Sequence, residues 1–339
     1  MDLRSHIRAL PKAELHLHLE GAIDPELMMR LAVRNNVDIP FRSADEIRAA
    51  CRFTRLQDFL DLYHQGMTVL RAEEDYFELT AAYLERVAAD GAVHVEVFFD
   101  PQGHTARGIP FATAADGILA ALADGRERLG ITSLLIMNVW RDLSEDDGFA
   151  AFRHAEPYVA DRRIAGLGLD STEIDHPPAK FERLYAAARE AGLRLVAHAG
   201  EEGPASYVAE AVDRLAVDRI DHGNRALDDP ALVRRLAERG MTLTVCPLSN
   251  LRLGVVPDLQ RHPLKRMLDA GLKATVNSDD PAYFGGYLLD NFVAVTEALE
   301  LEWADLVTLA RNSIEGSFLD DSARTAHLER IDRVVAADG

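Results

Sequence analysis

The chain has 339 residues, of which 48% are apolar, so it can bury a large core and global disorder is excluded. Acidic residues outnumber basic ones by 56 to 37, and the resulting net charge of −19 argues against nucleic acid and anionic membranes as partners. The two cysteines, Cys51 and Cys246, lie far apart, which excludes a disulfide framework and argues against a thiolate zinc site.

The first residues, MDLRSHIRALPKAELHLH, contain no apolar run long enough for a signal peptide. No stretch reaches the roughly 20 apolar residues that a membrane span needs. We therefore expect a cytoplasmic protein, and the sequence is compatible with a homo-oligomer. Since no linker, short repeat or low-complexity tract divides the chain, residues 1–339 are expected to form one domain.

Short apolar runs alternate with amphipathic helical segments along the whole chain, and this pattern predicts a parallel sheet. The segment Asp229–Arg239 illustrates the helices, with Asp at the N-cap, Pro at the first helical position and Gly240 after the end. Eight such strands favour a (β/α)₈ barrel, and a doubly wound open sheet is the structural alternative. The predicted strands are Glu14–Leu19, Val93–Phe99, Ser133–Trp140, Ile164–Asp170, Arg194–Ala199, Arg219–His222, Thr242–Pro247 and Lys273–Asp279.

The segment between the first two predicted strands is unusually long. Within it, Phe53–Gly66 and Glu74–Ala89 have helical patterns, which predicts extra helices inserted after the first strand. In a barrel these helices would lie at the catalytic mouth. They would be either ordinary peripheral helices or a lid, and the apolar wall of that lid would be Phe53, Leu56, Phe59 and Leu60.

Histidines and carboxylates follow several of the predicted strands. Active groups of a barrel lie at the carboxyl ends of its strands, so these side chains should meet at one rim. His16 and His18 are two residues apart, so they would share one face of their strand. The other members of this set follow the fifth, sixth and eighth strands and are His198, Glu201, His222, Asp279 and Asp280.

Imidazole and carboxylate ligands without a thiolate are typical of a catalytic zinc that keeps one position open for water. The fourth strand ends in GLGLDS, with no lysine to be carboxylated into a bridging ligand, which favours one metal over two. The zinc deaminases that use a PCxxC motif are a poor match. His94 and Glu96 give only the HxE half of that pattern, and we interpret both as structural residues inside the second strand.

The segments PKAELHLHLEGA, VAHAGEEGP, RIDHG, VCPLSN and NSDDPAYFGGY resemble the adenosine/adenine deaminase family of the amidohydrolase superfamily, from Pro11 to beyond Gly286. GLDSTE, HPPAKF, HPLKRMLDAGL and SDDPAYFGG resemble its adenine deaminase branch in particular. The resemblance implies a single Zn²⁺ per chain. Its ligands would be His16, His18, His198 and Asp279.

The resemblance also implies roles for three further residues. Glu201 would donate a proton to the purine ring, His222 would orient and deprotonate the attacking water, and Asp280 would hold the purine N7. The implied reaction is hydrolytic deamination of a 6-aminopurine, with adenine giving hypoxanthine and ammonia in purine salvage. The expected partner is therefore a small-molecule substrate.

Two departures from adenosine deaminases bear on the substrate. Glu20 stands where those enzymes characteristically carry Asp, and Ser171, Thr172 and Glu173 replace an Ala-Gly-Asp-Glu type of segment. Both changes enlarge side chains where a ribose would lie, so Glu20, Ser171 and Glu173 are predicted to bind substrate and to favour adenine. Adenosine, an N6-substituted adenine or an 8-oxidised adenine are the alternatives. A non-catalytic metal-binding barrel is a remote one, because it would need neither Glu201 nor His222.

Overall fold

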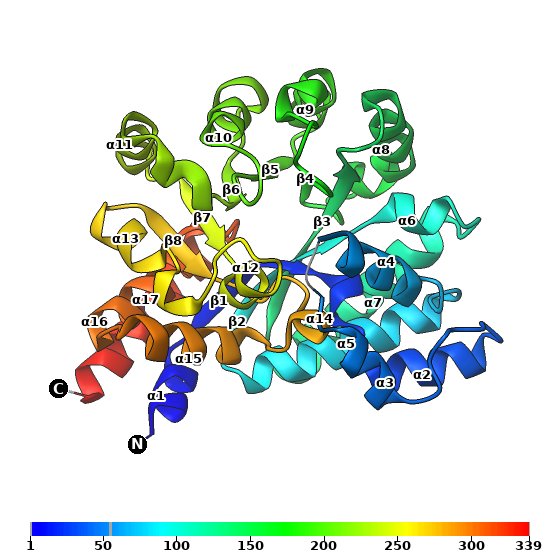
Figure 1. Ribbon diagram of the computed structural model, residues 1–339, viewed down its shortest axis with the longest axis horizontal. Coiled ribbons are helices and arrows are strands. Elements are labelled where there is room, and N and C mark those ends of the chain that lie inside the picture. The colour runs from blue at the N-terminus through cyan, green and yellow to red at the C-terminus, as the bar shows by residue number, and fades with distance from the viewer. Residues whose placement is uncertain (1, 54–55, 339) are drawn as a thin grey trace.

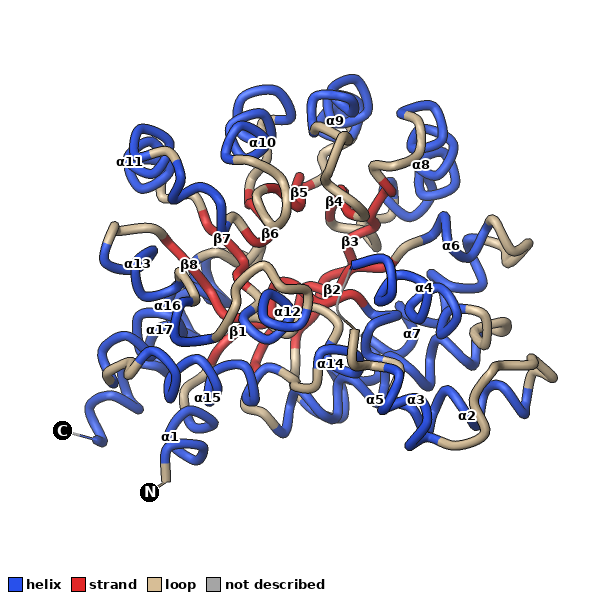
Figure 2. Tube along the Cα trace, in the orientation of Figure 1, coloured by secondary structure: helices blue, strands red, loops and turns tan. Residues whose placement is uncertain are grey.

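A computed structural model describes residues 2–53 and 56–338, and its eight strands form one parallel sheet in chain order (Figure 1). Each predicted strand is present, and the bounds differ by a few residues at most. The helices lie outside the ring of strands (Figure 2). The strands are β1 (Lys12–His18), β2 (Ala92–Phe99), β3 (Thr132–Trp140), β4 (Gly166–Asp170), β5 (Arg194–Ala199), β6 (Arg219–His222), β7 (Thr242–Val245) and β8 (Lys273–Val276).

The sheet closes where β1 meets the chain that follows β8. The backbone N–H of His18 donates to the carbonyl of Asp279 at 3.0 Å, and the N–H of Asp279 donates to the carbonyl of His16 at 3.1 Å. An isolated parallel bridge joins Leu17 to Asp279 at the same point. Because this contact joins the first and last strands, the predicted (β/α)₈ barrel is confirmed and the open-sheet alternative is wrong.

Outer helices connect the strands and follow the predicted pattern of ends. The predicted helix at Asp229–Arg239 is α11, whose first N–H groups donate to the Asp229 side chain and whose end is followed by Gly240 at φ 60°. None of the described helices is both long and apolar enough to cross a membrane. The α-helices that follow β2 in the chain are α6 (Pro101–Thr105), α7 (Phe111–Leu129), α8 (Glu145–Ala160), α9 (Glu182–Glu190), α10 (Ala205–Glu210), α11 (Pro230–Arg239), α12 (Pro247–Arg252), α13 (Leu264–Asp269), α14 (Pro281–Phe284), α15 (Leu288–Leu299), α16 (Trp303–Glu315) and α17 (Asp321–Asp338).

The extra helices predicted after the first strand are present. Phe59, on the third of them, packs its ring 4.7 Å from the ring of Phe284 and 5.6 Å from that of Phe53. This places the predicted apolar wall against the segment that follows β8, although the Leu56 side chain lies outside the described part of the chain. The inserted helices are α2 (Pro25–Arg34), α3 (Ala44–Ala50), α4 (Leu56–Met67) and α5 (Glu73–Ala89), and α1 (Leu3–Ala9) precedes the barrel.

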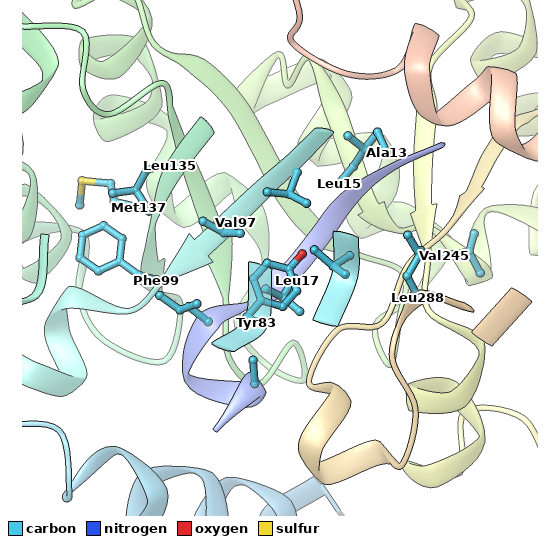
Figure 3. Packing of buried hydrophobic residues seen from close by; sticks show 14 of the residues in the cluster. Ala13, Leu15, Leu17, Tyr83, Val97, Phe99, Leu135, Met137, Val245 and Leu288 are labelled. Atoms are coloured by element: carbon cyan, nitrogen blue, oxygen red, sulfur yellow. The ribbon is translucent and has the colours of Figure 1, made fainter. Parts of the chain in front are cut away.

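Alternation along β1 separates the packing core from the interior of the barrel. Leu15 and Leu17 are fully buried and belong to the apolar cluster that also holds Tyr83 (Figure 3). Burying each such aliphatic side chain contributes roughly 1.5–3 kcal/mol. His16 and His18 point to the other face, and their imidazole rings lie 5.5 Å apart. The core therefore fixes the strand whose opposite face carries the histidines.

A buried ion pair lies inside the barrel, away from the rim. Arg219 and Glu96 are both fully buried and form an ion pair, and Arg219 Nη2 also donates to the carbonyl of Leu15 at 2.9 Å. His94 Nε2 lies 3.2 Å from Glu96 Oε1. The interpretation of His94 and Glu96 as structural residues is thus confirmed, since their side chains are used to link β2 to β6.

We expect Glu96→Leu to lower the free energy of unfolding by about 3–5 kcal/mol, because it leaves the Arg219 guanidinium buried without its partner. Asp116→Ala is the matched control, since it removes a half-exposed carboxylate 3.3 Å from Arg163. That surface pair should contribute less than about 1 kcal/mol. Urea unfolding of both variants measures the difference, and equal losses would contradict a structural role for the buried pair.

Candidate active site

Four side chains at the carboxyl ends of the strands bring their ligand atoms within 4.8 Å of one another. His16 and His18 come from β1, His198 from β5, and Asp279 follows β8. His18 Nε2 lies 3.1 Å from His198 Nε2, and His16 Nε2 lies 3.2 Å from Asp279 Oδ1. His16 Nε2 is buried and has no hydrogen-bond partner among the described residues. The sequence-predicted metal ligands therefore lie together.

This donor set fits a zinc ion. Three imidazole nitrogens and one carboxylate, with no thiolate, match the ligands of catalytic zinc sites. The outward ring nitrogens of His16 and His18 have partners of their own, as those of metal-binding histidines usually do, and His198 Nδ1 lies 3.8 Å from Asp221 Oδ2. His16 Nδ1 lies 2.9 Å from Thr244 Oγ1, and His18 Nδ1 lies 3.5 Å from Asp170 Oδ2. These contacts hold the Nε2 atoms toward a common point.

Cys246 lies close enough to three of the same groups to be a potential ligand, since it falls within 4.8 Å of His16, His222 and Asp279. However, burial, together with the charge of Asp279, raises the pKa of the Cys246 thiol well above its ordinary value. A metal binds the thiolate and not the thiol. The ligand set predicted from the sequence, His16, His18, His198 and Asp279, leaves this thiol out.

Glu201 and His222 lie beside this cluster, with His222 Nε2 3.5 Å from Glu201 Oε2. Burial and the neighbouring Asp279 raise the pKa of Glu201 well above its ordinary value. Burial and the neighbouring His16 lower the pKa of His222 to about 3. The raised pKa favours a protonated Glu201 and the lowered pKa favours a neutral His222, which places a donor next to an acceptor.

Glu173 holds the loop that carries Glu201. Its two carboxylate oxygens accept hydrogen bonds from four consecutive backbone N–H groups, those of residues 200–203, at 2.6–2.9 Å. The buried Arg141 lies 3.5 Å from Glu173 and donates to the carbonyl of His198 at 2.6 Å. We predicted a substrate contact for Glu173, but it does not line the cavity. The structure places it behind the loop, because its oxygens are used by the backbone.

Glu20 likewise does not line the cavity. Its Oε1 accepts from His104 Nε2 at 2.7 Å and from the backbone N–H of Asp100 at 3.0 Å, which holds it behind the wall. Asp280 and Ser171, the other residues predicted to bind substrate, do line the cavity. His104 lies 84 positions from Glu20 in the sequence, so no local sequence pattern predicts this contact.

The cavity itself has an empty volume of about 540 Å³, including space open to solvent. Helix α4 contributes Phe59, Leu60 and Tyr63 to its wall, so the inserted helix stands over the site. Asp100 and Asp170 also line it, and the sequence analysis did not assign them a role. Their positions in the sequence indicate the rim of the barrel, because Asp100 follows a predicted strand and Asp170 ends one, as the histidines do.

Three residues of this site have left-handed backbone angles that are uncommon outside glycine. The φ angles are 72° for Ser171, 64° for His222 and 65° for Asp279. Such conformations cost of order 1–3 kcal/mol each and gather at functional sites. They turn the chain sharply at the ends of β4 and β6 and after β8, where the residues of the site lie.

Comparison with known proteins agrees with this geometry. The sequence profile of the family described as Adenosine deaminase matches residues 11–334. An adenine deaminase of Sphingopyxis alaskensis is 62% identical over 96% of this chain and 95% of its own length. The crystal structure of an adenine deaminase from Arthrobacter aurescens has a TM-score of 0.93 and 49% identity, over 96% of this chain and 99% of that chain.

A crystal structure of an amidohydrolase from Burkholderia ambifaria with bound zinc has a TM-score of 0.89 and 33% identity, over 98% of this chain and 94% of that chain. The profile match spans residues 11–334. The adenine deaminases of Sphingopyxis alaskensis and Caulobacter vibrioides are 62% and 57% identical to this chain. The chain therefore belongs to the adenosine deaminase family, in its adenine deaminase branch.

Proposed function

We propose that this chain catalyses the zinc-dependent hydrolysis of adenine to hypoxanthine and ammonia. The observation that carries the proposal is that four potential metal ligands lie together beside one cavity, with Glu201 in its wall and His222 3.5 Å from Glu201. The adenine deaminases that are 50–62% identical over nearly the full chain support adenine as the substrate. The zinc in the Burkholderia amidohydrolase supports the metal.

When bound, a zinc ion supplies a water molecule whose pKa is lowered to about 7. His222 is neutral, so it can accept one proton of the water that attacks C6. Glu201 holds a proton and donates it to N1, which removes the aromatic resistance of the ring to addition. The proton on His222 then passes to the amino group, which leaves as ammonia. The second hydrogen of the water returns to Glu201 as the C6 carbonyl forms.

Asp280 is placed to orient the purine. Its Oδ1 is buried without a partner among the described residues, and the side chain lines the cavity. Burial and the neighbouring Asp279 raise its pKa well above the ordinary value, so Asp280 can hold a proton for N7. The aromatic and apolar side chains of α4 and Trp140 offer faces for the ring.

The reaction would convert free adenine into hypoxanthine, another purine base, and we propose that it serves purine salvage. Cys51 and Cys246 are both free and buried, which suits the reducing cytoplasm in which we propose that the enzyme works. Adenosine and N6-substituted adenines stay as alternative substrates of the same machinery, because Glu201 and His222 act on the C6 edge alone.

We expect Glu201→Gln to keep its metal and to lose turnover by at least about 10²–10⁴-fold. Gln is nearly isosteric with Glu, so the cavity should stand, but it cannot supply and recover the proton at N1. The measurement combines kcat for adenine with the metal content of the purified variant. A kcat close to that of the unmodified protein, with metal bound, would show that another group is the acid.

We expect kcat/KM for adenine to exceed that for adenosine by up to ~10⁴-fold, because a site that pairs with a substrate N–H rejects an analogue that lacks it. Ammonia release from adenine, adenosine and N6-methyladenine is the direct comparison. Equal values for adenine and adenosine, or a preference for adenosine, would overturn adenine as the substrate while leaving hydrolytic deamination in place.

A further inference from the structure

Two carboxylates in the cavity wall have no assigned contact with the substrate in the reaction described above. Asp100 directly follows β2 and Asp170 ends β4, and they are 2% and 3% exposed. Each uses one oxygen within the protein. Tyr63 donates its hydroxyl to Asp100 Oδ2 at 2.9 Å, and Asn138 Nδ2 donates to Asp170 Oδ2 at 2.9 Å. These bonds fix the orientation of both carboxylates.

The second oxygen of each carboxylate is unsatisfied. Asp100 Oδ1 and Asp170 Oδ1 are buried and have no hydrogen-bond partner among the described residues. A carboxylate without a proton is an acceptor only, and a proton shared between the two groups would still leave lone pairs free on both. A buried acceptor without a donor destabilises the folded chain. A substrate N–H in the cavity can supply such a donor.

The position of the pair defines which part of a substrate it meets. Since the strands follow one another in chain order around the barrel, β2 to β4 form one arc of the rim and β5 to β8 the other. Glu201, His222 and Asp279, which act on C6, lie on the second arc. Asp100 and Asp170 stand on the first arc, within 4.8 Å of His18. A purine whose C6 edge is held by the second arc would turn the rest of its ring toward them.

Adenine has two kinds of hydrogen-bond donor, the amino group on C6 and the N–H of its imidazole ring. The amino group is the leaving group and lies at the reacting carbon. We propose that Asp100 Oδ1, assisted by Asp170 Oδ1, accepts the imidazole N–H, and that this contact selects the free base over purines substituted there. The inference rests on the proposed function, and it names the residues that set the specificity of that function.

Glu20 supports the backbone of Asp100. Glu20 Oε1 accepts the backbone N–H of Asp100 at 3.0 Å and is held in turn by His104 Nε2 at 2.7 Å. Tyr63 comes from the inserted helix α4, so the Asp100 backbone is held by Glu20 and its side chain by Tyr63. Glu20 is thus a positioning residue for Asp100.

The test compares adenine with 9-methyladenine in the holoenzyme and its variants. The second compound lacks the N–H at N9, and it is measured both as a substrate and as a competitive inhibitor. The unmodified enzyme should prefer adenine by ~10²-fold or more. We expect Asp100→Ala to lower kcat/KM for adenine by ~10-fold or more and to shrink that preference by a similar factor. Asp124→Ala, which removes a surface carboxylate on α7, should change neither.

Asp100→Asn separates the acceptor from the shape of the side chain and serves if the alanine variant does not fold. It keeps the volume but replaces a charged acceptor with a neutral one, so the preference should fall by about 3-fold or more. Thermal unfolding and metal content establish that each variant is intact. A preference retained in full by both variants, or by Asp100→Asn alone, would overturn the proposal. If the unmodified enzyme releases no ammonia from adenine, the proposed function fails instead.

Discussion

The closure of the barrel is the constraint on which the site depends. Two backbone hydrogen bonds join Asp279 to His16 and His18, and the same three residues supply three of the four potential metal ligands. A register shift of one residue would turn both histidines to the outer face of β1, where Leu15 and Leu17 now pack. The apolar core outside the barrel therefore sets the register, and the register sets the ligand geometry.

Charge is the second constraint, because the cavity gathers carboxylates that would repel one another. Burial raises the pKa of both Glu201 and Asp280, and the charge of Asp279 adds to the effect. Burial and the neighbouring His16 lower the pKa of His222. The charge of Asp279 thus favours the protonated forms of Glu201 and Asp280, whereas burial and His16 favour the neutral imidazole of His222. A divalent cation at the cluster would balance that carboxylate and polarise the groups around it.

The part of the fold that repeats along the chain could be predicted from the sequence. Periodic apolar runs indicate strands, and strand ends indicate the rim, so His16, His18, His198 and Asp279 could be brought together without a structure. Whether a carboxylate faces the cavity or the backbone could not be predicted. Glu173 and Ser171 lie two positions apart, yet one supports the Glu201 loop and the other lines the cavity.

The reason is that these roles depend on hydrogen bonds between segments far apart in the sequence. Glu173 is fixed by N–H groups nearly 30 positions later, and Glu20 by His104. Asp100 and Asp170 carried the same strand-end signal as the histidines. Carboxylates after strands are common as helix caps, however, and the donors Tyr63 and Asn138 come from separate elements. An oxygen without a hydrogen-bond partner is significant only when it is buried. That burial can be seen only in the folded structure.

The metal content of the purified protein tests the central claim most directly, namely that His16, His18, His198 and Asp279 form one zinc site. Elemental analysis should find one zinc per chain, chelation should abolish deamination, and added zinc should restore it. Loss of binding in His198→Ala would assign the metal to this cluster. Two metals per chain, or none after zinc supplementation, would contradict the account.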